Sequence, residues 1–64
     1  MLVEIYIGTK NITTVDWSQV PDEGESIVID GKDYKVYART WFIFNSNLPA
    51  LTSPSEVHIY LKEI

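Results

Sequence analysis

The chain has 64 residues, with nine acidic and five basic side chains, and a formal net charge of −4. A domain of this size buries only about 60% of the surface that its unfolded chain exposes, so small proteins commonly add disulfides, a metal ion or a second subunit. Cysteine is absent and histidine occurs once, which excludes disulfides and thiolate metal sites, and a single histidine cannot by itself build a zinc site. We therefore expect one domain over residues 1–64 that is completed by a homodimer.

The hydropathy and charge patterns argue against a membrane or a nucleic acid as the partner. The longest strictly apolar run is Trp41–Phe44, far short of the roughly 20 residues that a membrane-spanning helix needs. Residues after Met1 alternate in polarity, without the basic and then apolar segments of a secretory leader. The basic side chains are scattered along the chain, whereas nucleic-acid binding requires a basic patch that neutralises phosphates. We expect a cytoplasmic protein.

The N-terminal part of the chain predicts two strands. Residues 2–7 alternate between apolar and mixed positions, the pattern of a half-buried strand. A turn follows at residues 8–11, and four β-branched residues at 12–15 predict a short second strand. Residues 16–20 either extend this strand or form one helical turn capped by Asp16.

An acidic turn comes next, because Pro21 fixes its own φ and Gly24 can take the left-handed conformation. The carboxylates around this turn lack the ligand spacing of a calcium-binding loop, so we interpret them as solvated. The turn and the tryptophan before it are candidates for contact with a partner protein: Trp17, Asp22, Glu23 and Glu25.

The centre of the chain predicts a β-hairpin. Asp30-Gly31 stands between alternating apolar runs, which is the strongest short-range signal for a tight hairpin turn. The arms are residues 25–29 and 32–44, and the second arm is longer than the usual strand of about five or six residues. Its alternation also changes phase. A bulge near residues 38–40 would return Trp41 to the face of the preceding apolar residues and bend the strand.

The C-terminal part predicts a loop and a last strand. Residues 45–55 are rich in proline, serine and asparagine, and residues 56–62 return to strict alternation. The predicted fold is all-β, with four or five antiparallel strands. These form either a small SH3-like barrel or a strongly bent sheet, completed by dimerisation.

The run of four bulky apolar residues in the second arm predicts an interface. Successive side chains of a strand point to opposite faces, so one thin core cannot bury both pairs. An exposed apolar patch on a soluble protein commonly marks an interaction site, and aromatic residues are enriched at interface cores. The alternative is that a bulge and the 45–55 loop cover the second face within one subunit. The candidates for the dimer or partner interface are Trp41, Phe42, Ile43 and Phe44.

The sequence predicts neither catalysis nor a cofactor or metal site. The one histidine, His58, has no serine or aspartate at a spacing that suggests a catalytic triad, and we interpret it as a surface or interface residue. The three glycines lie in turns, and none belongs to a phosphate-binding loop. Exposed aromatic residues on a small barrel can bind single-stranded nucleic acid, but here no basic residues are interleaved with them.

The pattern V-P-x-x-G-x-x-I-x-I-x-G-x-x-Y-x-V at residues 20–36, followed by Arg39-x-Trp41 and a terminal V-x-I-Y-L, resembles small β proteins encoded by phages and prophages of Gram-positive bacteria. Some such proteins inhibit bacterial anti-phage defence, among them the inhibitor of the Hachiman helicase–nuclease system. The resemblance covers more than half of the chain and implies a class of protein, with no functional residue to transfer.

The function expected from this resemblance is that of a non-catalytic phage protein. It would bind a protein of the bacterial host, in particular a component of a defence system, and inhibit it. Two alternatives remain open at this point: a structural or accessory component of the virion, and a small barrel that binds nucleic acid.

Overall fold

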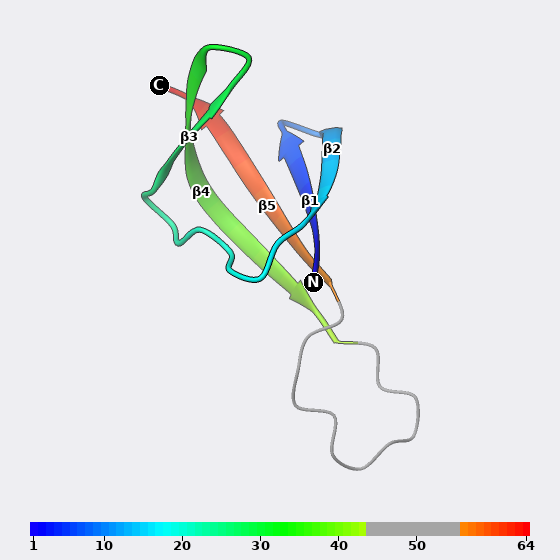
Figure 1. Ribbon diagram of the computed structural model, residues 1–64. Coiled ribbons are helices and arrows are strands. Elements are labelled where there is room, and N and C mark those ends of the chain that lie inside the picture. The colour runs from blue at the N-terminus through cyan, green and yellow to red at the C-terminus, as the bar shows by residue number, and fades with distance from the viewer. Residues whose placement is uncertain (44–55) are drawn as a thin grey trace.

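A computed structural model describes residues 1–43 and 56–64 (Figure 1). Phe44 and the predicted loop at residues 45–55 lie outside the described residues. The strands are β1 (Leu2–Ile7), β2 (Lys10–Asp16), β3 (Ser26–Ile29), β4 (Lys32–Phe42) and β5 (Glu56–Glu63). The predicted all-β fold is confirmed. Within the described ranges no helix is long and apolar enough to cross a membrane.

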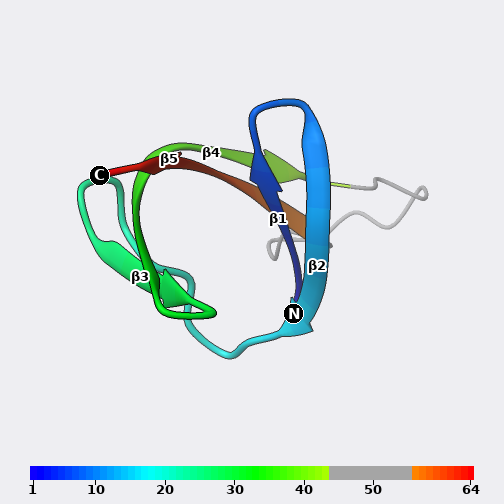
Figure 2. The same cartoon turned by 90° about the horizontal axis from the view of Figure 1, so that it is seen from above.

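The five strands form one sheet in the order β2-β1-β5-β4-β3, and the sheet curls into a half-barrel (Figure 2). Pairing is antiparallel within both hairpins and between β4 and β5, but β1 and β5 run parallel. The prediction of purely antiparallel strands therefore fails at this central pair. Parallel neighbours need a long connection between them, so no local turn signal in the sequence reports their pairing.

Local signals set the geometry of the β3–β4 hairpin. Both residues of its two-residue turn have positive φ, 50° at Asp30 and 81° at Gly31, as a tight turn matched to the twist of the strands requires. The register of β4 against β5 shifts between Val36 and Ala38, which is a β-bulge. The bulge lies slightly earlier than predicted, and it places Trp41 on the same face as Val36, as expected.

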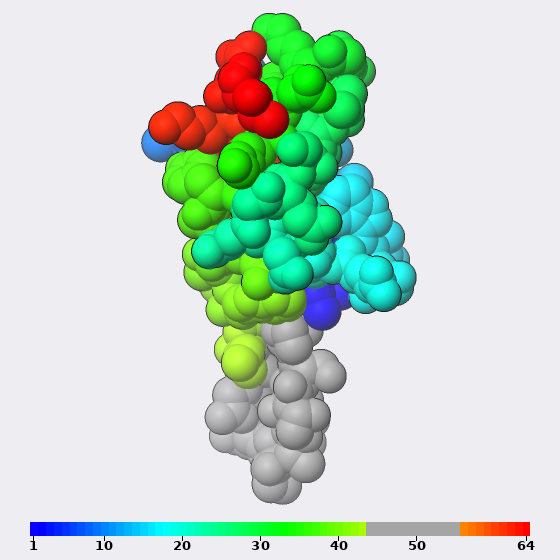
Figure 3. Space-filling view, turned by 90° about the vertical axis from the view of Figure 1, so that its left-hand side faces the viewer, coloured from blue at the N-terminus to red at the C-terminus, as the bar shows by residue number. Residues whose placement is uncertain are grey.

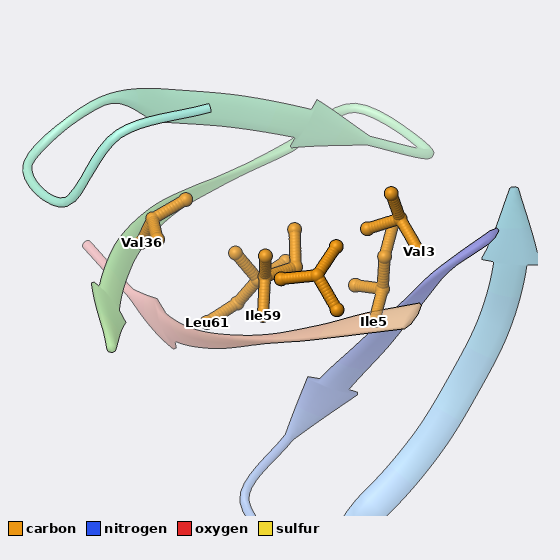
Figure 4. Packing of buried hydrophobic residues seen from close by; sticks show 6 residues of the cluster. Val3, Ile5, Val36, Ile59 and Leu61 are labelled. Carbon is orange, nitrogen blue, oxygen red and sulfur yellow. The ribbon is translucent and has the colours of Figure 1, made fainter. Parts of the chain in front are cut away.

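The hydrophobic core lies on the concave face of the curled sheet, here called the inner face. Side chains from β1, β4 and β5 point toward one another across the half-barrel (Figure 4). The buried residues, each at most 2% exposed, are Val3, Ile5, Val36, Val57, Ile59 and Leu61. The convex side, here called the outer face, carries the alternate residues of the same strands.

The connection between β2 and β3, residues 17–25, passes across the open side of the half-barrel (Figure 2). Residues 16–20 form no helical turn: β2 ends at Asp16, and the Trp17 N–H still donates a hydrogen bond to the Met1 carbonyl at 3.0 Å. Trp17 and Val20 are half-buried and pack against the core. The connection therefore covers part of the inner face that the sheet leaves open.

Candidate functional site

The apolar run at the end of β4 is divided between the two faces of the sheet. Trp41 is 43% exposed and Ile43 is 60% exposed. Phe42 lies on the outer face, where it is half-buried and its ring centroid is 4.3 Å from that of His58. Among the members of the run that the structure describes, Trp41 and Ile43 are therefore the ones with exposed side chains.

Arg39 joins the exposed tryptophan to the acidic turn. Its guanidinium carbon lies 5.4 Å from the centroid of the Trp41 ring, a distance at which cation and ring attract each other. Its Nη1 atom lies 3.2 Å from Oδ1 of Asp22 and donates to the Pro21 carbonyl at 3.4 Å. Two segments that the sequence predicted as separate candidates thus form one surface.

We call this surface the tryptophan end and define it as Trp17, Pro21, Asp22, Arg39 and Trp41. Trp17 and Pro21 line a shallow hollow of about 300 Å³. Figure 3 shows the β2–β3 connection packed directly against β4 on this side of the molecule. The tryptophan end consequently combines an exposed ring, a hollow and an ion pair.

The acidic turn is held by its own hydrogen bonds. The Asp22 N–H donates to the Glu25 carboxylate at 2.7 Å, and the Glu25 N–H donates to the Asp22 carbonyl at 3.1 Å. Gly24 has a φ of 93°, which only glycine adopts at low cost. Asp22 and Glu25 therefore fix the shape of the turn and also give it negative charge, whereas Glu23 is exposed to solvent.

A second group of functional side chains lies on the outer face, where β1 and β5 pair. We call it the outer-face cluster and define it as Glu4, Tyr6, Phe42, Glu56 and His58. Glu4 stands opposite His58 in the parallel register, and Glu56 precedes His58 by two residues on the same face. The Nε2 atom of His58 lies 2.7 Å from Oε2 of Glu4 and 2.5 Å from Oε2 of Glu56.

Two rings enclose the imidazole of the cluster. The Phe42 centroid is 4.3 Å and the Tyr6 centroid 5.1 Å from the His58 ring. As a result the His58 side chain is only 14% exposed, against 28% for Glu4 and 25% for Glu56. The rings continue across the outer face, because Tyr6 stacks on Tyr60 at 5.4 Å.

The electrostatics of the cluster keep Glu56 ionised. The hydrogen bond with His58 holds the pKa of the Glu56 carboxyl below its ordinary value, and partial desolvation opposes it. Partial desolvation and the nearby Glu4 carboxylate raise the pKa of the Tyr6 hydroxyl. The cluster can therefore hold a proton or a cation between two carboxylates.

Sequence reasoning missed both Arg39 and the carboxylates around His58. The Glu56-x-His58 spacing on an alternating strand does place those two side chains on one face. Glu4 has no such signal, because its position depends on the parallel register of β1 against β5. The interpretation of His58 as a surface or interface residue left out these partners.

Comparison with known proteins gives no relative for the chain. No protein-family model, curated protein or solved structure matches it. The functional conclusions below therefore rest on the residues and geometry described above.

Proposed function

We propose that the protein is a non-catalytic binding protein whose tryptophan end contacts a basic surface of a host protein. The observation that carries this proposal is the exposed Trp41 ring, which is 43% exposed and lies beside the Arg39–Asp22 pair. Tryptophan and arginine are the residues most enriched among interface hot spots. The net charge of −4 favours a basic partner, because complementary charge speeds association.

The biological role that we propose is inhibition of a bacterial anti-phage defence system, in the cytoplasm of the host cell. Support for this role comes from the resemblance of residues 20–36 and 57–61 to small phage and prophage proteins. The acidic side chains near the tryptophan end, Glu23 and Glu25, would extend the contact with a basic surface.

A second copy of the chain is the other partner that we propose. Ile43 is 60% exposed, and a core of this size rarely supplies more than about 3–5 kcal/mol, so a dimer would both cover apolar surface and add stability. Multi-angle light scattering at micromolar concentration should give twice the chain mass of 7.3 kDa. A clean monomer would contradict the dimer and leave the host-protein proposal standing.

Phage plating on bacteria that carry a defence system tests the inhibitory role. Expression of the protein should restore plating, and Trp41→Ala should abolish this rescue, since loss of a hot-spot tryptophan typically weakens binding about 30-fold or more. Tyr37→Ala is the matched control, because Tyr37 is an exposed aromatic residue of the same strand. It should restore plating as wild type does.

Three results would contradict the proposal. Rescue by Trp41→Ala equal to that by wild type would exclude the tryptophan end as the contact. Co-purification of the protein with virions would instead identify a virion component. Salt-dependent retardation of DNA or RNA would identify a nucleic-acid-binding protein.

A further inference from the structure

We propose that Glu4, Glu56 and His58 bind one divalent transition-metal ion, which links β1 to β5. The proposal departs from the sequence-based expectation of no metal, and it is independent of the protein-binding function. That expectation considered the single histidine alone, whereas the fold adds two carboxylates to it. The three donor atoms converge, since all lie within 4.8 Å of one another.

The geometry needs only a small adjustment to admit an ion. Zinc bonds imidazole nitrogen and carboxylate oxygen at about 2.0–2.2 Å in tetrahedral geometry, which sets neighbouring donor atoms roughly 3.4 Å apart. The His58 nitrogen now lies 2.7 Å and 2.5 Å from the two carboxylate oxygens. Because both glutamates are partly exposed, rotation of their side chains can open this spacing while the sheet stays unchanged.

The charge of the cluster favours a cation. With a neutral imidazole, Glu4 and Glu56 bring two negative charges together. Within residues 1–43 and 56–64, His58 is the only basic group in ion-pair contact with either carboxylate. A divalent ion would balance both charges, whereas a protonated imidazole balances one.

The donor set selects the class of metal. One imidazole and two carboxylates suit zinc and its first-row neighbours, since imidazole is a preferred ligand of these ions. Calcium takes about six to eight oxygen ligands and magnesium keeps a shell of water, so both fit this site poorly. Phe42 and Tyr6 hold the imidazole from two sides, which orients its Nε2 atom toward the carboxylates.

The position of the site indicates a structural role. The ligands come from the first and the last described strands, which pair at the centre of the sheet. A bond between residues far apart in the sequence closes a long loop, and metal binding to a folded site stabilises the fold directly. The bound ion would add stability beyond that of the hydrophobic core, which small domains commonly need.

Zinc titration of tag-free, chelator-treated protein tests the proposal, because a histidine tag would itself bind zinc. Calorimetry should show one zinc ion per chain, and saturating zinc should raise the melting temperature by about 5 °C or more. Since the chain has one histidine, the imidazole nitrogen resonances of the wild-type protein come from His58 alone. Its Nε2 signal should shift on zinc addition, and cobalt should give the visible absorption of a tetrahedral site.

Glu4→Gln and Glu56→Gln should each weaken zinc binding by about tenfold or more, as even outer-shell changes at metal sites commonly do. Glu63→Gln is the control, since Glu63 is an exposed carboxylate of the same strand, and it should bind zinc as wild type does. Circular dichroism confirms that each variant is folded. The proposal is overturned by no binding at about 100 μM zinc, by unchanged affinity in both glutamine variants, or by zinc binding without a rise in melting temperature. Failure by any of these leaves the direct contacts of His58 with the two carboxyl groups as its role.

Discussion

The outer-face cluster and the tryptophan end both use side chains of β4, but the fold holds them in different ways. The cluster draws its residues from β1, β4 and β5, which are neighbours in the sheet, so backbone pairing positions every member. The tryptophan end joins β4 to an irregular connection through the side-chain contacts of Arg39, beside two backbone hydrogen bonds that Val36 makes with Gly24 and Glu25. The cluster should therefore persist as long as the sheet does, whereas the tryptophan end can loosen while the sheet stays folded.

Two natural reporters separate these regions. Both tryptophans of the chain belong to the tryptophan end, and the one histidine belongs to the outer-face cluster. Tryptophan fluorescence and the imidazole resonances of His58 therefore report on one region each. The following substitutions use this separation.

The largest effect is expected for Ile59→Ala, which should disrupt both regions together. Ile59 is fully buried in β5, and removing such a side chain costs about 2–5 kcal/mol. This is comparable to the roughly 3–5 kcal/mol that so small a core supplies. We expect circular dichroism, fluorescence and the imidazole signals to show a largely unfolded chain. The control is Ile64→Ala, at a 74% exposed position, which should behave as wild type. An Ile59→Ala variant that keeps native spectra and unfolds cooperatively would contradict the assignment of Ile59 to the core.

A smaller, local effect is expected for Phe42→Ala. Phe42 is half-buried and contacts His58, so we expect a loss of about 1–2 kcal/mol from reduced apolar burial. Urea unfolding measures the loss, and the imidazole resonances should shift while tryptophan emission stays constant. Tyr37→Ala removes a more exposed ring of the same strand and should leave His58 unchanged. A change in tryptophan emission would show that the two regions are coupled.

Arg39→Ala should affect the tryptophan end alone. It removes the contact with the Trp41 ring, the hydrogen bond to Pro21 and the pair with Asp22, together about 1 kcal/mol. Tryptophan emission should move to longer wavelength, and the His58 resonances should not change. Arg39→Lys keeps the charge but loses the planar guanidinium, so it should restore only part of the emission. Full restoration by lysine would mean that charge alone accounts for the contribution of Arg39.

The smallest effect is expected for Asp22→Asn. The Asp22 side chain is 75% exposed, and exposed ion pairs contribute roughly 0–1 kcal/mol. We expect the urea midpoint to change by less than it does in Arg39→Ala, and we expect this change to disappear at high salt. Glu23→Gln, which removes an exposed charge from the same turn, provides the control. An effect as large as that of Arg39→Ala would mean that the ion pair, and not the ring contact, accounts for the contribution of Arg39.

Local parts of the fold could be predicted from the sequence because neighbouring residues determine them. Asp30-Gly31 requires a tight turn, and the alternation at residues 2–7 and 56–62 marks two strands whose inner residues are the core. The bulge in β4 was predicted from the phase of the apolar residues. Its position was predicted slightly too late, because Ala38 is small enough to occupy either face.

Contacts between distant segments could not be predicted. The parallel pairing of β1 with β5 brings Glu4 to His58, and nothing near either residue specifies that pairing. The role of Arg39 likewise depends on the path of the connection across the half-barrel. Sequence patterns identified Trp41 and Asp22 as separate candidates, and only the fold showed that Arg39 joins them.

The place of β5 between β1 and β4 has a consequence for the order in which the sheet assembles. The β1–β2 and β3–β4 hairpins can each form from contacts between neighbouring segments, but neither contains the whole core. Until β5 pairs with both β1 and β4, the two hairpins have no common core and each presents an unpaired edge. Folding should therefore be completed late and in one step, when β5 inserts between two hairpins that were made earlier.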